Sequence, residues 1–181
     1  MAHSSPASAQ MPAALDTFPA LLFAHADVRG SRPAIREKDL GIWQTLTWSQ
    51  VAEHVRQVAH GLASLGIQPG MHVAVIGENR PRLYMAMMAA QSLGAIPVPL
   101  YQDAVAQEMV YVLQDAEISV AVVEDQEQVD KMLEVREQCP ALKHVVYDDP
   151  RGLRHYSDAM LLSYDRLEEI GREYAAQHPD F

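Results

Sequence analysis

The segment Gly77-Glu78-Asn79-Arg80 is the first place in the chain where nucleotide chemistry could be expected. It ends an apolar run that begins at His72, and the turn between a buried strand and the next helix binds phosphate in many α/β sheets. A phosphate-binding turn needs several glycines for close backbone approach, whereas here one glycine precedes an acid that would repel the ligand. We therefore predict a helix start, with Asn79 as the cap and Pro81 in the first turn.

Acidic and histidine side chains are the next candidates for chemistry. A Mg²⁺ site is one interpretation of the acidic residues, and a solvated helix start, where negative charge favours the helix dipole, is the one we prefer. The acidic residues follow one predicted strand and enter the next helix: Glu124, Asp125, Glu127 and Asp130. His54 and His60 lie about 240° apart around a predicted helix, so they do not converge and we expect solvated histidines.

Motifs of the common nucleotide-binding and hydrolytic enzymes are absent from the 181 residues. There is no Gly-x-Ser-x-Gly elbow, no dinucleotide fingerprint, no Walker-type phosphate loop and no His-rich metal motif. We therefore assign no catalytic, cofactor-binding or metal-binding residue from the sequence.

Composition argues against a nucleic-acid partner and indicates a reducing compartment. The 24 acidic residues outnumber the 14 basic ones, and a net charge of -10 would repel a nucleic-acid backbone. The single cysteine, Cys139, cannot form an intrachain disulfide, so we expect a reducing, cytoplasmic location. Residues 1–15 lack the charged start and apolar centre of a secretory signal, and we predict a disordered tail there and one domain over residues 16–181.

The uncharged stretch Leu83–Tyr101 is long enough to invite a transmembrane interpretation. Gly94, Pro97 and Pro99 would interrupt a membrane helix, whereas they suit a helix that stops and a buried strand that follows. We therefore predict no transmembrane segment.

The elements at the start of the chain are set by capping and turn residues. Thr17 is expected to cap a helix over Phe18–Val28, and a β-hairpin follows, with strands Ala34–Lys38 and Trp43–Thr47. Thr47 and Gln50 have the spacing of a capping box and begin a helix whose apolar stripe ends at Gly66.

Strands and helices then alternate. Near-continuously apolar strands separated by helices indicate a parallel sheet, so the predicted fold class is α/β, a partial doubly wound, mainly parallel sheet with flanking helices, preceded by the short helix and the hairpin. The predicted strands are His72–Gly77, Ala95–Leu100, Ser119–Val123 and His144–Tyr147. The predicted helices are Leu83–Leu93, Val105–Ala116, Gln126–Gln138 and Tyr164–Ala176, with no strand after Tyr147.

The helix over Leu83–Leu93 is apolar almost all round, because it holds Met85, Met87 and Met88 beside Leu83 and Tyr84. Such a helix is normally buried. A flexible hydrophobic docking surface is the alternative, since thioether side chains adapt to varied partners.

Several strings, in this order, resemble the N-terminal part of the adenylate-forming acyl-CoA synthetases of the AMP-binding superfamily. They are Thr47-Trp48-Ser49-Gln50, Gly61–Ile67, Pro69–Val75, Glu78-Asn79-Arg80-Pro81 and Gly94–Tyr101. Within that superfamily, Glu108–Leu113, Asp130–Glu134 and Asp148–Leu153 look most like the long-chain fatty acid branch. The resemblance covers roughly Phe18 to Pro179.

The resemblance implies the first part of the large domain of a fatty acid-CoA ligase. The family uses ATP, Mg²⁺ and coenzyme A to convert a carboxylate to an acyl-adenylate and then to an acyl-CoA. The family's catalytic motifs would all follow Phe181: the Ser/Thr/Gly-rich phosphate loop, the nucleotide contacts and the C-terminal-domain lysine. We therefore carry over no catalytic residue. The chain alone is expected to be inactive and to bind no cofactor. Its expected partner is the rest of such a polypeptide. The alternative is a free-standing module that associates with itself through an uncovered sheet edge or the Met-rich helix.

Overall fold

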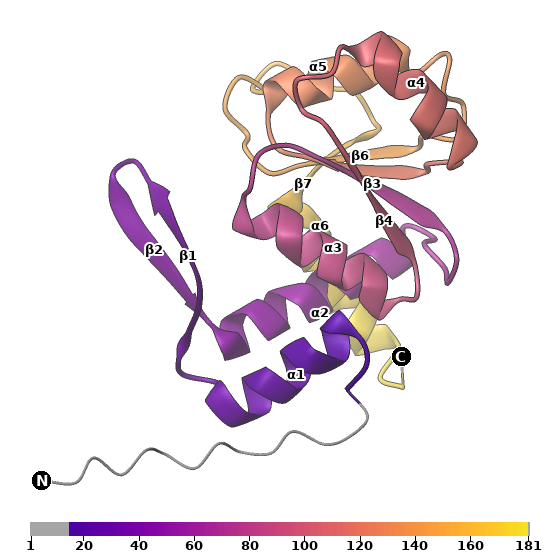
Figure 1. The fold of residues 1–181 in the computed structure, drawn as a ribbon. Coiled ribbons are helices and arrows are strands. Elements are labelled where there is room, and N and C mark those ends of the chain that lie inside the picture. Colours follow the sequence, from indigo (N-terminus) through magenta and orange to yellow (C-terminus); the bar gives the residue numbers. More distant parts are fainter. Residues whose placement is uncertain (1–14, 181) are drawn as a thin grey trace, which may run out of the picture.

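A computed structural model describes residues 15–180, and it contains a five-stranded parallel sheet with helices on both faces and a separate two-stranded hairpin (Figure 1). The predicted tail, apart from Leu15, lies outside the described residues. The predicted α/β class, with a mainly parallel sheet after a short helix and a hairpin, is confirmed.

The first helix and the hairpin form where the capping and turn residues place them. Helix α1 (Phe18–Arg29) begins after Thr17, whose Oγ1 accepts a hydrogen bond from the Ala20 N–H at 3.3 Å. Leu40 and Gly41 both have positive φ, 46° and 83°, which is the geometry of a two-residue hairpin turn that matches the twist of its strands. The turn joins the antiparallel strands β1 (Pro33–Asp39) and β2 (Ile42–Thr47).

Helix α2 (Trp48–Ser64) has the predicted capping box. The Thr47 N–H donates to Gln50 Oε1 at 2.8 Å, and the Gln50 N–H donates to Thr47 Oγ1 at 3.3 Å. Two of the four backbone donors left without partners at a helix start are thereby satisfied. The apolar stripe of α2 packs into the core, and Gly66 follows the helix in a left-handed conformation with φ 90°.

The main sheet has the strand order β4-β3-β5-β6-β7, and all of its strand pairs are parallel. Its strands are β3 (His72–Ile76), β4 (Ile96–Leu100), β5 (Val120–Val123), β6 (His144–Tyr147) and β7 (Leu161–Ser163). The helices that connect or follow them are α3 (Pro81–Ser92), α4 (Ala106–Asp115), α5 (Gln126–Val135) and α6 (Tyr164–Gln177).

Strand β7 contradicts the prediction that no strand follows Tyr147. It has three residues and ends at Ser163, which is also the cap of α6, so it is too short to show the periodicity of a strand. Its pairing with β6, in which Leu161 stands opposite Val145, creates the strand. The predicted end of α5 at Gln138 is also wrong, because the helix stops at Val135 and the next residues form turns.

The sheet is buried on both faces, as parallel sheets require. Val73 and Val75 point to one face, where they meet α2, α3 and α6, and Ala74 and Ile76 point to the other, where they meet α4 and α5. Figure 1 shows α4 and α5 above the sheet and the other helices below it. Among the described residues, no helix is both long and apolar enough to cross a membrane.

Candidate functional site at the carboxyl edge of the sheet

The winding of the sheet reverses between β3 and β5. The chain passes from β3 outward to β4 and then returns to β5 on the other side of β3. In open α/β sheets, ligands bind beyond the carboxyl ends of the strands at such a reversal. Gly77 follows β3 and Glu124 follows β5, so these two residues mark the crevice in which a nucleotide would be sought.

The carboxylate of Glu124 fills this crevice. Its Oε2 accepts a hydrogen bond from the Glu78 backbone N–H at 2.5 Å, and its Oε1 accepts one from Arg80 Nε at 2.8 Å. Glu124 is only 9% exposed. The hydrogen bond to Glu124 raises the pKa of Arg80, which keeps the guanidinium charged. A side-chain carboxylate therefore holds the donors that a bound phosphate would need.

Gly77 allows this close contact. Its φ of +153° lies in a region that side chains disfavour, and a Cβ atom there would lie 2.5 Å from the Cβ of Glu124. Gly77 therefore serves the packing of a buried carboxylate.

The prediction that Asn79 caps α3 is wrong. The N-cap residue is Arg80, which makes no side-chain capping bond, and Asn79 Oδ1 instead accepts from the Tyr84 hydroxyl at 2.8 Å. The physical reason is Pro81, which occupies the first turn as predicted and forces the residue before it into an extended conformation. The helix consequently starts one residue later than a cap at position 79 would allow.

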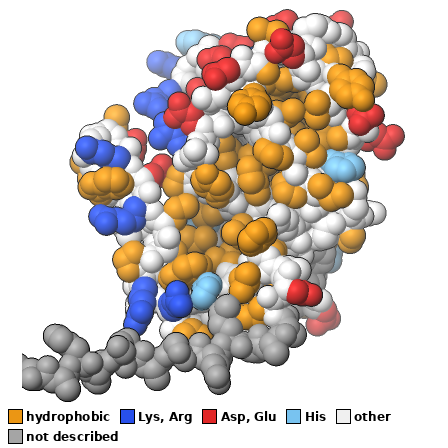
Figure 2. All heavy atoms as spheres, viewed as in Figure 1, with side chains coloured by type: hydrophobic (Ala, Val, Ile, Leu, Met, Phe, Trp, Pro, Cys, Tyr) orange, Lys and Arg blue, Asp and Glu red, His pale blue; other side chains and the backbone are white. Residues whose placement is uncertain are grey.

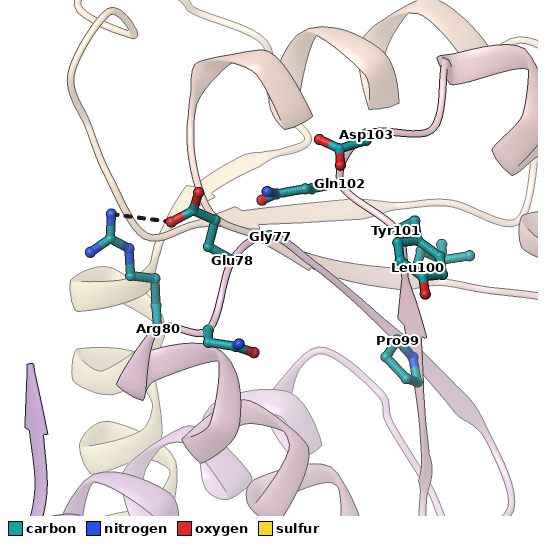
Figure 3. Close-up of a pocket in the computed structure, with 9 residues that line it drawn as sticks. Gly77, Glu78, Arg80, Pro99, Leu100, Tyr101, Gln102 and Asp103 are labelled. Carbon is teal, nitrogen blue, oxygen red and sulfur yellow. Dashed lines mark ion pairs between the residues drawn. The ribbon is translucent and has the colours of Figure 1, made fainter.

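An open hollow of about 680 Å³ lies between the turns that follow β3 and β4. Figure 3 shows Glu78 and Arg80 on one side of it, and Pro99, Leu100 and Tyr101 on the other. Its lining residues include no serine, threonine, cysteine or histidine, and its acidic side chains are those of Glu78 and Asp103. The hollow combines an apolar wall with a polar turn, which suits contact with a ligand or with another segment of polypeptide.

A second charged contact fixes the start of α3 to the end of the sheet. Arg82 pairs with Asp148 Oδ1 at 3.1 Å and with Asp165 Oδ1 at 2.6 Å. The Tyr164 hydroxyl donates to the Arg82 carbonyl at 3.0 Å, and the guanidinium lies 4.9 Å from the centre of the Tyr164 ring. Burial raises the pKa of Asp148, although Arg82 opposes the shift. The contact joins three elements, which indicates a structural role.

The acidic cluster divides into separate contacts, and the prediction of a solvated helix start is wrong for Glu124, which is buried between the ends of β3 and β5. Asp125 accepts from the Gln128 N–H at 3.3 Å as the cap of α5, and Asp130 accepts from the Tyr156 hydroxyl at 2.6 Å. The Lys131 ammonium, 2.7 Å from Glu127, lowers the pKa of that carboxyl group. Over residues 15–180, no three His, Cys, Asp or Glu side chains are arranged to hold a metal ion.

The expectation of solvated histidines is wrong for His54. Its Nδ1 lies 2.6 Å from Glu168 Oε1, and Glu168 is buried. The partner comes from α6, which packs along α2. His60 lies near Tyr174 of the same helix, with 6.4 Å between the ring centres. These contacts link residues far apart in the sequence, and no local pattern signals them.

A family model and several curated relatives place the chain among the same group of enzymes. The family model described as "AMP-binding enzyme" matches residues 22–170. The long-chain-fatty-acid-CoA ligase FadD15 of Mycobacterium tuberculosis is 32% identical over 131 residues, which is 72% of this chain and 20% of the relative. The ligase ACSBG1 of Rattus norvegicus is 27% identical over 154 residues, 84% of this chain and 21% of that protein. The chain thus spans about a fifth of the length of these curated relatives.

Solved structures share the fold. Acetoacetyl-CoA synthetase from Streptomyces lividans matches with a TM-score of 0.73 and 21% identity, covering 83% of this chain and 24% of that one. The anthranilate CoA ligase AuaEII in complex with anthranoyl-AMP matches with a TM-score of 0.71 and 23% identity, covering 83% and 26%. At these identities, the likeness concerns the path of the backbone.

Proposed function

The chain belongs to the AMP-binding enzyme family, and on that premise we propose that it is the N-terminal section of the large domain of a long-chain fatty acid-CoA ligase. The complete enzyme would use ATP to form an acyl-adenylate from a fatty acid and would transfer the acyl group to coenzyme A. The long-chain ligases among its relatives, such as FadD15, support this choice of substrate class.

The role proposed for this section is structural. It would form part of the sheet behind the acyl and nucleotide sites and would supply no catalytic residue. The observation that carries the proposal is the Glu124 carboxylate, which takes the Glu78 N–H and the Arg80 guanidinium at the reversal of the sheet. An incoming phosphate would have to displace a buried anion that already makes charge-assisted hydrogen bonds. The residues described here therefore do not fit the phosphates of ATP, and we assign them no step of the reaction.

Calorimetry tests this proposal directly. The purified chain is titrated with ATP and Mg²⁺, and no saturable heat is expected, because Glu124 already takes the Glu78 N–H and the Arg80 guanidinium. The matched experiment measures acyl-adenylate and acyl-CoA formation by the same preparation, which should be at background. Saturable micromolar binding of ATP, or adenylate made by the chain without a contaminating ligase, would contradict the proposal.

A free-standing interaction module is the second candidate. It is favoured by the exposed apolar side chain of Tyr84 on α3, beside methionines that are only half-buried. Sedimentation velocity separates the two functions, because a self-associating module would sediment faster as its concentration rises. A compact monomer at every concentration would count against it.

We also propose a cytoplasmic location for the complete enzyme. Cys139 is a free, buried thiol whose pKa is raised by burial, so it is an inert side chain suited to a reducing compartment. Fractionation of cells that express a tagged chain would test the location.

A further inference from the structure

The hairpin of β1 and β2 projects from the body of the protein and has two chemically different faces (Figure 1). Residues that stand opposite each other in an antiparallel pair lie on the same face, and the face alternates with each residue along a strand. Arg36 stands opposite Thr45, and Lys38 stands opposite Trp43. These four residues therefore form one face, the basic face of the hairpin, which carries no acidic residue.

The acidic residues of the hairpin lie on its other face, which is turned toward the body. Glu37 and Asp39 line a hollow of about 440 Å³ together with Arg80, Arg82 and Arg151. The hairpin thus separates its charges: its carboxylates share a hollow with arginines of the body, and its basic side chains point away from that hollow.

The basic face places two cations beside an exposed aromatic ring. The guanidinium of Arg36 lies 5.2 Å from the centre of the Trp43 ring, and Lys38 is the direct cross-strand neighbour of Trp43. The Trp43 side chain is 59% exposed, and Leu40 in the adjoining turn is 84% exposed. Within residues 15–180, neither cation is paired with a carboxylate. Figure 2 shows basic and hydrophobic side chains together on the projecting hairpin, at the left of the view.

We propose that the basic face of the hairpin is a contact surface for a lipid bilayer that carries anionic headgroups. A tryptophan ring is stable at the boundary between headgroups and acyl chains, because it has an apolar body and a polar N–H. Arginine and lysine beside it attract anionic lipid phosphates, and the exposed Leu40 adds apolar area. The hairpin lies on the bilayer along this face, which leaves Glu37 and Asp39 on the side away from the headgroups.

The net charge of -10 does not prevent this contact, because the charges that approach the bilayer first are those of the basic face. Electrostatic interactions between exposed charges decay over about 8 Å at physiological ionic strength. Nucleic acid is the other polyanion that a basic, aromatic face could bind. The bilayer is favoured because Leu40 and Ile42, both exposed at the tip, have apolar side chains that a phosphate backbone does not accommodate. The inference goes beyond the proposed function and does not depend on it.

Vesicle flotation tests the contact surface. The chain is expected to float with vesicles that contain phosphatidylglycerol, not with vesicles of phosphatidylcholine alone, and added sodium chloride should release it. The double variant Arg36→Gln Lys38→Gln should lower the partition coefficient about tenfold or more. The matched control is Lys143→Gln Arg154→Gln, which removes the same charge from exposed positions outside the hairpin and should bind like the unaltered chain.

Tryptophan fluorescence shows whether the hairpin itself meets the lipid. The chain has two tryptophans, so Trp48→Phe leaves Trp43 as the single reporter. Its emission should move to shorter wavelengths with the anionic vesicles and should be quenched by brominated lipids, because the ring enters the interface. Melting temperatures check that each variant is folded. Trp43→Thr, which keeps a strand-forming residue, is a second variant that should weaken flotation several-fold.

Three results would overturn the proposal. They are no flotation of the unaltered chain with anionic vesicles, equal flotation of the Arg36→Gln Lys38→Gln variant and its control, and equal binding to neutral vesicles. A shift of the Trp43 emission that duplex DNA produces and anionic vesicles do not would identify nucleic acid as the partner, and it would also overturn the proposal.

Discussion

The side chain of Glu124 lies against the α-carbon of Gly77, so closely that a Cβ atom at position 77 would be 2.5 Å from the Cβ of Glu124. The two residues are neighbours because β3 and β5 pair in parallel and both strands end at the same edge. The contact decides whether the crevice at the reversal of the sheet is open or filled, so substitutions at either residue should change stability or anion binding.

Gly77→Ala is expected to lower the free energy of unfolding by about 2 kcal/mol or more, because it combines a disfavoured φ with overpacking against Glu124. Urea unfolding followed by circular dichroism measures the change. Gly70→Ala is the matched control, since Gly70 also has positive φ, 83°, but has open space where a Cβ would stand. Equal losses for the two variants would contradict the role given to the Glu124 contact.

Glu124→Ala is expected to lower the free energy of unfolding by about 1 to 2 kcal/mol, because the Glu78 N–H and Arg80 lose a shared acceptor. A larger loss of stability is not expected, because the Arg80 side chain is 39% exposed and water replaces part of the lost contact. Glu127→Ala removes a carboxylate whose side chain is 68% exposed from its pair with Lys131, so it is the control and should change stability little. No loss in Glu124→Ala would show that its hydrogen bonds are unimportant.

The same Glu124→Ala variant should gain affinity for inorganic phosphate. Removal of the carboxylate leaves a backbone N–H and a guanidinium facing an empty crevice, and an anion that binds the folded state raises the melting temperature. Thermal unfolding with and without sodium phosphate, at constant ionic strength set by sodium chloride, measures the effect. An equal response of the variant and the unaltered chain would contradict the view that Glu124 occupies an anion site.

Stability is expected to fall as the pH is lowered below about 6.5, in part because burial depresses the pKa of His144 below its ordinary value of 6.5. A histidine with a lowered pKa binds fewer protons in the folded state than in the unfolded state, so unfolding takes up a proton and acid favours it. The stabilising contribution is complete above pH 6.5, and it is lost as the pH falls from that value through the lower pKa of the folded state. Melting temperatures between neutral and mildly acidic pH, compared with those of His144→Gln, test this, and the variant should show a smaller decline.

Restoring donors to the edge of β4 should make the chain associate. The double variant Pro97→Thr Pro99→Thr places two N–H groups on a free edge that now has none, and an unprotected edge strand is a template for pairing with another chain. Sedimentation should show faster-moving species that increase with concentration. Pro150→Thr, in an exposed loop, is the control, and it should sediment like the unaltered chain at every concentration. A double variant that behaves like this control would mean that the prolines do not protect the edge.

The secondary structure follows closely from local sequence. The capping box of Thr47 and Gln50 and the strand His144–Tyr147 are found as predicted. The capping box depends on residues within one turn, and the strand is centred on two buried valines. Strand β7 was not predictable in this way, since three residues acquire their conformation from pairing with β6. The prediction of an Asn79 cap was wrong because Pro81 holds Arg80 in an extended conformation and makes Arg80 the N-cap residue.

The candidate site could be predicted only in part. Gly77 and Glu124 stand out in the sequence at the ends of predicted strands, but the sequence places each at the start of a different helix and does not show that they meet. Their contact depends on the order of strands in the sheet, which sequence periodicity does not determine. The pair His54 and Glu168 was missed for the same reason, because it needs the packing of α6 on α2.

The packing of α6 on α2 determines where the polypeptide can be truncated or split without loss of the fold. Tyr164 and Leu167 are completely buried in the same cluster as Leu62, and the backbones come so close that a side chain on Gly171 would overlap the Gln57 carbonyl. Shortening the protein before α6 would expose α2 along its length, so expression boundaries and split-protein designs should keep Tyr164–Gln177 with the first helices. Proteases should accordingly cut the exposed hairpin turn at Leu40 well before they reach the junction of these two helices.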